Sequence, residues 1–510
     1  MAKTTTLILL INSLTKGEKR YFKLYSSLQA GAKDYLTLFG LIETHIDPKS
    51  IRAAYSKTKP RSSFEVSQKY LYRVITDCLL HLRADQNVVN KLVTALLKTN
   101  ILFEKSLYEE GFRQLTKIIE AAGKYELHWI QLWACRSELV HLSNLNFYSL
   151  SETELEQKHL RITELLRNAG SGHQLTSLYE SLRHRLLYKG NVRTLQQKEE
   201  LNDLLMSEVN IVSNSKEEQV ESQKTHLLFQ AYYFITISNY QAALQTFYEL
   251  NELLEQHNYL WADSPVDYLN TLEGILDSLH TIRRYKEMQY FLEKIRSIEM
   301  PALYLEVMAQ RVLFRFELVG LLDTGRFDKA EKLIDTYDDP LIKKLHLLDT
   351  SKQADVYLYI ALIYIGKNDM SRAHYYLNKV LLQNKLFYSL PIYRTFRLVH
   401  LLVHYELGNH NYLSSETRSI KRALDINNSD TYSMEKLIFK FIENPELLKS
   451  SRSKTAFLSK LREDFFHIKE DKYSIQLLKV FDFITWIEAK LGSKNFAAML
   501  REKTTAETTS

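Results

Sequence analysis

Residues 314–337 read FRFELVGLLDTGRFDKAEKLIDTY and contain two apolar series separated by a polar turn. In the first series, residues at the spacing of one helical face are Phe314, Leu318 and Leu321. Gly325 follows in the turn, and Phe327 and Ala330 open the second series. The stretch therefore predicts a helical hairpin made of two amphipathic helices. One hairpin cannot bury both apolar faces, so such hairpins have to stack on neighbours.

Four other segments repeat this pattern, with first helices that begin near residues 227, 272, 357 and 398. The small or apolar residue that opens each second helix falls at Gly111, Ala243, Met288, Ala330, Ala373 and Ser414. From Ala243 onward the spacing is 45, 42, 43 and 41 residues, and the gap of 132 residues before it predicts two degenerate repeats. A period of this size is typical of helical solenoids. We expect an all-α fold with about seven to eight hairpins between residues 92 and 425.

These segments resemble tetratricopeptide repeats. The resemblance is carried by a turn in which Gly or Asn, an aromatic residue and Ala follow in order, as in Gly325-Arg326-Phe327-Asp328-Lys329-Ala330 and Asn239-Tyr240-Gln241-Ala242-Ala243. Small side chains there let two helices approach closely. The resemblance implies a right-handed superhelix of hairpins whose concave face holds a peptide or protein. The period is longer than the roughly 34 residues usual in that family, and the Pro that commonly ends each unit is mostly absent.

The composition is typical of long helices in a reducing compartment. The 510 residues include only 14 Gly and 7 Pro, and 45% of them are hydrophobic, which suffices for a continuous core. Two cysteines, Cys78 and Cys135, are too few for a secreted disulfide scaffold. The short apolar run at residues 7–11 lacks the features of a signal peptide. The sequence also contains no uninterrupted run of 18 apolar residues, the length that could span a membrane. We expect a cytoplasmic protein.

Charge and aromatic residues are distributed unevenly along the chain. Residues 1–90 carry 14 Lys and Arg against 7 Asp and Glu, so the whole positive excess of +6 lies there. We expect a basic amino-terminal helical domain over residues 1–90 and the repeat array over residues 91–425. Residues 426–502, rich in Phe, should form a helical cap that shields the outer face of the last repeat. The polar residues 503–510 should be a disordered tail.

The sequence contains no catalytic or nucleotide-binding motif, so we expect a protein without enzyme activity, cofactor or metal. Gly170-Ser171-Gly172-His173 has no preceding strand and no following Lys, which favours a connection between helices over a phosphate loop. His400 and His404 have the spacing of two metal ligands on one helix face. Because the sequence shows no third ligand nearby, a structural or surface pair is favoured over a metal site.

The position of each residue within its repeat predicts which residues of the first helices face the inner side of the solenoid. Lys and Asn do not cluster there, which argues against the carboxylate clamp of some tetratricopeptide proteins. Towards the carboxyl end the projected positions are apolar, which suits a hydrophobic or amphipathic partner segment. The alternative is that packing within the superhelix buries these positions. The candidate groove residues are Tyr232, Asp277, Arg315, Leu358, Leu362, Phe396 and Val399.

Two functions are compatible with these features. The favoured one is a non-enzymatic scaffold or adaptor whose concave face holds a protein or peptide. The other is a nucleic-acid-binding regulator, because residues 34–45 and 48–56 outline a helix-turn-helix within the basic region. In outline, this arrangement resembles bacterial peptide-sensing transcription regulators. The alternative for the basic residues is a solvated face of a helical cap. They are Lys16, Lys19, Arg20, Lys23, Lys49 and Arg52.

Overall fold

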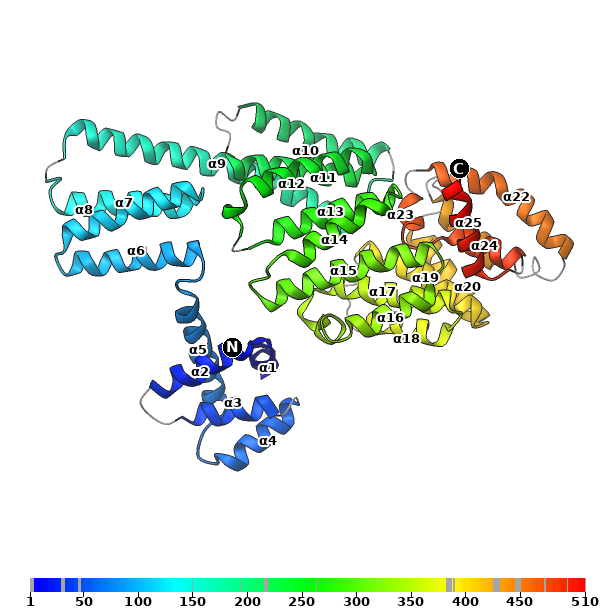
Figure 1. Ribbon diagram of the computed structural model, residues 1–510, viewed down its shortest axis with the longest axis horizontal. Coiled ribbons are helices and arrows are strands. Elements are labelled where there is room, and N and C mark those ends of the chain that lie inside the picture. Colours follow the sequence, from blue (N-terminus) through cyan, green and yellow to red (C-terminus); the bar gives the residue numbers. More distant parts are fainter. Residues whose placement is uncertain are drawn as a thin grey trace. The chain divides into compact units, whose positions relative to one another are not determined.

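The computed structural model describes residues 4–28, 33–44, 47–148, 150–193, 195–214, 219–262, 264–381, 388, 390–424, 432–444, 451–471, 474–492 and 494–509. All regular secondary structure in these ranges is helical, with no strand among them, so the expected all-α class is confirmed (Figure 1). No described helix has both the length and the apolar character that crossing a bilayer requires. The residues group into two compact units, Met1–Ala169 and Gly170–Ser510. The divisions expected at residues 90 and 425 remain predictions.

Unit 1 begins with a bundle of five helices: α1 (Thr4–Ser13), α2 (Lys16–Leu28), α3 (Asp34–Thr44), α4 (Pro48–Thr58) and α5 (Phe64–Arg83). Local signals fix two of the helix starts. Thr15 N–H donates to Glu18 Oε2 at 2.8 Å, and Glu18 N–H donates to Thr15 Oγ1 at 3.2 Å, which confirms the capping box. Asp47 caps α4, and Pro48 occupies the first turn. Apolar residues from all five helices form one core.

The rest of unit 1 is a row of longer helices: α6 (Val88–Glu104), α7 (Tyr108–Lys124), α8 (His128–Asn144) and the first part of α9 (Glu152–Lys189). α6 packs on α7, and α7 packs on α8. Their shared core includes Leu96 of α6, Leu115 of α7 and Leu139 of α8. The unit is therefore built from successive helices that each bury one face against a neighbour.

Unit 2 continues with α10 (Leu195–Asn214) and then five hairpins: α11 (Val220–Thr236) with α12 (Tyr240–Gln256), α13 (Val266–Thr281) with α14 (Tyr285–Ser297), α15 (Leu303–Asp323) with α16 (Phe327–Tyr337), α17 (Thr350–Gly366) with α18 (Met370–Leu381), and α19 (Ile392–Glu406) with α20 (His410–Ala423). Short 3-10 helices η1 (Asn258–Leu260) and η2 (Ile342–Leu347) lie between hairpins. Consecutive helices pack together, and α13, α15, α17 and α19 also pack on one another in that order (Figure 1). This is compatible with a helical repeat array.

Five further helices follow in unit 2: α21 (Ser433–Ile442), α22 (Ser451–Glu470), α23 (Ile475–Leu478), α24 (Phe483–Gly492) and α25 (Phe496–Thr509). α25 contains residues 503–509, for which the sequence predicted a disordered tail. Lys503 contributes to this difference, because its Nζ lies 2.5 Å from Asp482 Oδ2 and ties the end of the chain to the rest of the unit. A polar sequence can remain helical where one of its side chains is anchored in this way.

Among the residues that the structure describes, eight helices end in the same backbone turn. In each turn one residue has a left-handed φ, and the N–H of the next residue donates to the carbonyl five residues earlier. The α15 turn is typical, with Arg326 N–H donating to Leu321 O at 2.8 Å and Gly325 N–H donating to Leu322 O at 3.0 Å. This is the Schellman arrangement, which satisfies the last carbonyls of a helix. The left-handed residues are Ser106, Glu126, Asn146, Ser238, Arg283, Gly325, Asn368 and Gly408.

Small residues occupy the predicted crossings between the two helices of a hairpin. Ala243, Ala330 and Ala373 are completely buried, as the turn pattern predicts. The equivalent position in the last hairpin was assigned to Ser414, and this is wrong by one residue. Its turn places the helix start at His410, so the fourth residue after the turn is the buried Leu413, whereas Ser414 is exposed.

Two expectations for residues 128–214 are also wrong. Gly170-Ser171-Gly172-His173 lies inside α9 and is not a connection between helices. Gly170 and Gly172 have no left-handed φ and have open space around them, so nothing in their surroundings breaks the helix there. Because α9 is 38 residues long, the segment contains three helices, whereas two degenerate hairpins would need four.

Replacing Ala330 by Leu should destabilise the fold by about 1–3 kcal/mol, because the larger side chain overpacks a fully buried crossing. Urea unfolding followed by circular dichroism measures the loss. Ser414→Leu is the control: it places the same side chain on an exposed position and should change stability by no more than about 0.5 kcal/mol. Equal stability of the two variants would argue against the crossing.

Candidate functional site

Four of the projected groove residues are buried within unit 2. Leu358, Leu362, Phe396 and Val399 are at most 2% exposed. The helices that carry them, α17 and α19, bury apolar residues around most of their circumference. A helix of this kind needs cover on more than one side. The expectation of an open apolar groove at these four residues is therefore wrong, and the alternative of burial by packing holds for them.

The charged residues of the projected groove lie together. Asp277 of α13 and Arg315 of α15 form an ion pair, with Arg315 Nη2 2.7 Å from Asp277 Oδ1. One turn earlier on the same helices, Arg311 pairs with Glu273, and Arg311 Nη1 lies 3.3 Å from Asp355 Oδ2 of α17. Three successive first helices are thus joined by one row of alternating charges. The repeat phase correctly placed these residues on a shared side.

Tyr232, the remaining groove candidate, is half-buried on α11. The Arg183 guanidinium of α9 lies 4.2 Å from the centroid of its ring, a cation–π contact. The Tyr179 ring of α9 is 5.9 Å from the same ring. Tyr232 is therefore engaged by α9 on the side that the sequence assigned to a partner.

A segment near the carboxyl terminus runs along the first helices of the array. We define the C-terminal segment as residues 474–492 together with α25. Its polar contacts are Gln476 Nε2 donating to Ser238 Oγ at 2.7 Å, Lys479 Nζ donating to Asp277 Oδ2 at 2.7 Å, Trp486 Nε1 donating to Glu406 Oε1 at 3.1 Å, and Arg501 Nη2 donating to Gly325 O at 3.0 Å. The partners of these groups belong to α13, to α19 and to the turns that follow α11 and α15. This region thus reaches far beyond the last repeat, which the sequence expected it to cap.

Aromatic residues attach the same segment to the hairpins. The Phe496 ring lies 6.0 Å from the Phe327 ring of α16 and 5.4 Å from the Phe481 ring. Leu362 and Phe481 line the same small space, so the segment covers at least one of the projected groove residues. The apolar side chains of the segment belong to the same continuous core as the hairpins. The cover is therefore part of the fold.

The charges at this junction are strongly coupled. Burial raises the pKa of the Asp277 carboxyl, but the Lys479 ammonium and the Arg315 guanidinium outweigh it and hold that pKa below its usual range. Burial lowers the pKa of Lys479, but the Asp277 carboxylate outweighs it and leaves that pKa raised. Both side chains are thus held in their charged form. A carboxylate shared by two cations fixes the position of the segment on α13.

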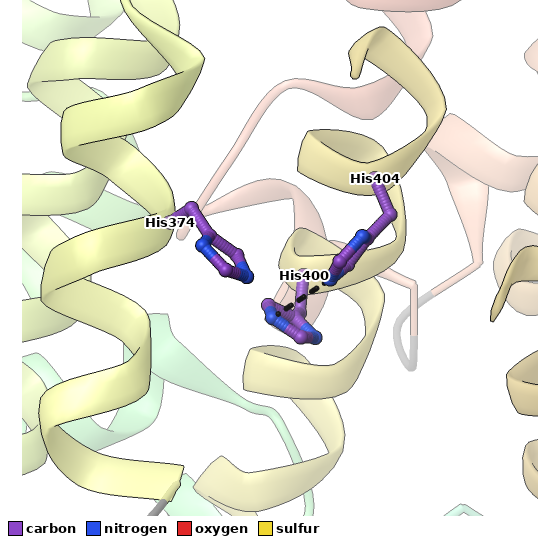
Figure 2. Close-up of side chains that lie close together, drawn as sticks. All are labelled: His374, His400 and His404. Carbon is purple, nitrogen blue, oxygen red and sulfur yellow. Dashed lines mark hydrogen bonds between the residues drawn. The ribbon is translucent and has the colours of Figure 1, made fainter. Parts of the chain in front are cut away.

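A second cluster, of three histidines, lies between α18 and α19 (Figure 2). His374 comes from α18, and His400 and His404 lie one turn apart on α19, with His400 Nε2 and His404 Nε2 3.2 Å apart. His400 Nδ1 is 3.0 Å from the Tyr412 hydroxyl, and Asn409 Nδ2 donates to His404 Nδ1 at 2.8 Å. Of the two alternatives for this pair, structural or surface, the surface one is wrong, because both α19 histidines are buried, and a third imidazole lies beside them.

The protonation state of this cluster follows from its surroundings. Burial, together with the neighbouring imidazoles of His404 and His374, lowers the pKa of His400 to about 3. Burial and His374 also lower the pKa of His404, against an opposing effect of Glu416. The two buried imidazoles are therefore neutral at physiological pH, and each carries one N–H group and one nitrogen lone pair.

The residues of the predicted basic patch lie on two helices of unit 1. Lys16, Lys19, Arg20 and Lys23 of α2 line one shallow depression that also includes Glu43. Glu43 neutralises part of this charge, with Oε1 3.4 Å from Lys19 Nζ and Oε2 3.1 Å from Lys23 Nζ.

The other two residues of the patch, Lys49 and Arg52 on α4, are not among the residues lining that depression. Arg52 is paired as well, with Nη2 2.5 Å from Glu65 Oε1. Acidic partners thus accompany three of the six cations, two on α2 and one on α4.

Sequence reasoning missed two groups that the structure brings together. Lys479 and Asp277 are 202 residues apart, and no local pattern connects them. His374 and His400 lie on different helices, α18 and α19. That His374 belongs to the cluster can therefore be seen only from the packing of these two helices. The one available signal was the density of aromatic residues after residue 430, which indicated packing but not its location.

No family model matches the chain, and no curated protein is similar enough to match it. The resemblance to tetratricopeptide repeats therefore rests on the turn pattern.

Gly325→Ala tests the docking of α25. Both Gly325 and Gly408 have a left-handed φ, so an Ala at either position should cost about 1–2 kcal/mol in backbone strain. A Cβ at Gly325 would also lie 2.5 Å from Ala497 O of α25, whereas nothing lies within 4 Å of one at Gly408. We expect Gly325→Ala to lower the melting temperature more than Gly408→Ala and to speed proteolysis near α25. Indistinguishable variants would contradict this docking.

Proposed function

We propose that the chain is a non-enzymatic scaffold that binds a protein partner, with α8 of unit 1 as the centre of the binding surface. The observation that carries the proposal is an exposed aromatic face on this helix. Trp129 is 68% exposed and Trp133 is 47% exposed, one helical turn apart, and Val140 continues the same face at 48%. Large exposed aromatic residues at helical spacing are typical of binding surfaces, where Trp is a frequent energetic anchor.

The exposed face of α8 carries Trp129, Trp133 and Val140, with the charged Arg136 among them. Its opposite side buries Ala134, Cys135 and Leu139 against the neighbouring helices. By contrast, α7 buries one apolar face and turns charged residues such as Arg113 and Lys117 to solvent. A helix that is apolar on both sides is normally covered on both. This difference favours a partner on the open side of α8.

The neighbouring helix also exposes apolar residues. α6 contacts α8 directly and exposes Leu97 at 53% and Ile101 at 55%. In hairpin order α6 and α8 are first helices, the ones that the resemblance to tetratricopeptide repeats would place on the concave side. An amphipathic helix whose apolar residues recur every three or four positions would suit such a surface. We therefore propose that the partner binds on the concave side, at the exposed apolar residues of α6 and α8 in unit 1.

Replacing Trp129 and Trp133 together by Ala should weaken partner binding by roughly 30-fold or more, the loss expected for a hot-spot anchor of about 2 kcal/mol. Affinity purification with the full chain identifies a partner, and titration of that purified partner measures the affinity. Tyr148→Ala removes another exposed aromatic side chain of unit 1 and is the matched control. Equal affinity of the double variant and the control would remove α8 from the interface.

The rival function predicts DNA binding by the basic residues of α2 and α4. We expect the purified chain not to retard duplex DNA even at low salt, because Glu43 and Glu65 already pair with part of the charge. A gel-shift titration over a range of salt concentrations measures this. Retardation that weakens steeply with salt and is reduced by Lys49→Ala and Arg52→Ala would instead support the regulator.

A further inference from the structure

Three imidazoles from neighbouring helices converge between α18 and α19, and Figure 2 shows their rings turned toward one another. One nitrogen from each of His374, His400 and His404 lies within 4.8 Å of the other two. Among the residues that the structure describes, no other group of three His, Cys, Asp or Glu side chains is gathered in this way. The sequence alone offered only the pair on α19, which is one ligand short of a metal site.

The distances suit a small ion with nitrogen ligands. Zn–N bonds of about 2.0–2.1 Å at tetrahedral angles place two ligating nitrogens about 3.3 Å apart. His400 Nε2 and His404 Nε2 are 3.2 Å apart, so these two nitrogens already have the separation of two ligands of one Zn²⁺ ion. The nitrogen of His374 is within 4.8 Å of them and could complete the set by rotation of one side chain.

A second layer of side chains orients the two buried rings. The Tyr412 hydroxyl is 3.0 Å from Nδ1 of His400, and Asn409 is 2.8 Å from Nδ1 of His404. Both rings therefore direct Nε2 inward, as metal-ligating histidines do when the other nitrogen is held by a polar partner. Asn409 can present either its NH₂ group or its carbonyl oxygen, so the oxygen can accept a hydrogen bond from His404 Nδ1–H when Nε2 ligates a metal.

We propose that His374, His400 and His404 bind a Zn²⁺ ion. Neutral imidazole nitrogens suit Zn²⁺, whereas Ca²⁺ and Mg²⁺ require oxygen ligands. The ion would replace the hydrogen bond between His404 and His400. His374 is only partly buried, so the ion would enter from its side, with a water as fourth ligand. This proposal does not depend on the scaffold function.

The ion would link two hairpins. α18 is the second helix of one hairpin and α19 is the first helix of the next, and the two pack on each other. A metal bound only by the folded arrangement stabilises it. The melting temperature of the full-length chain should therefore rise when Zn²⁺ is added after treatment with a chelator, and should fall again when excess chelator is restored.

The test uses full-length chain stripped of metal and titrated with ZnCl₂ by calorimetry, with circular dichroism as a check of folding. We expect one Zn²⁺ per chain and an affinity that falls by about 10-fold or more in His374→Gln and in His404→Gln, since even an outer-layer change commonly costs that much. His346→Gln, an exposed histidine of η2, is the matched control and should bind as the unchanged chain does.

A second measurement covers variants that fail to fold. Co²⁺ added to the unchanged chain should give the intense visible absorption of a four-coordinate site, and Zn²⁺ should abolish it. Absence of Zn²⁺ uptake by the unchanged chain would overturn the proposal. So would wild-type affinity in both folded variants, or weak Co²⁺ absorption typical of a six-coordinate ion on the surface.

Discussion

In this structure the first helix of a hairpin can be apolar on more than one side, and each such side has to be covered. α15 and α17 bury residues around most of their circumference, so packing within the hairpin alone would leave part of their apolar surface in water. Unit 2 meets this requirement with its own chain, because the C-terminal segment belongs to the same core as the hairpins. In unit 1, α8 buries one face, and Trp129 and Trp133 remain exposed on another. This contrast is the basis for locating a partner there.

Charge fixes where the covering segment lies. Apolar contacts are non-directional and would tolerate a shift of the segment along the hairpins. The ion pairs of Asp277 do not tolerate such a shift, because its two carboxylate oxygens lie 2.7 Å from Arg315 Nη2 and 2.7 Å from Lys479 Nζ. Moving the segment would leave a buried carboxylate with one cation and a buried ammonium with none, a costly arrangement. The charged row therefore specifies position, while the aromatic contacts provide most of the burial.

The sequence predicted features that depend on neighbours along the chain. The hairpin turns, the capping box at Thr15 and the buried Ala330 follow from local spacing and side-chain size. The repeat phase also grouped Asp277 with Arg315 correctly, because 3.6-residue periodicity carries over from helix to helix.

The failures are of two kinds. Gly170 and Gly172 suggested a break where surrounding helix formers kept α9 continuous, since helix propensity is a weak prior. The contacts of Lys479 and His374 depend on packing between distant segments, which no local pattern encodes.

The C-terminal segment also indicates what kind of ligand these helices accept. It is largely helical, packs through Phe481 and Trp486, and places Lys479 on Asp277 and Arg501 on the Gly325 carbonyl. Because it belongs to the same chain, its effective concentration at this surface is high, and a free partner would compete with it poorly. At α8, Trp129 and Trp133 are exposed among the residues that the structure describes. The scaffold proposal therefore requires unit 1 to bind in trans the kind of helical segment that unit 2 already binds in cis.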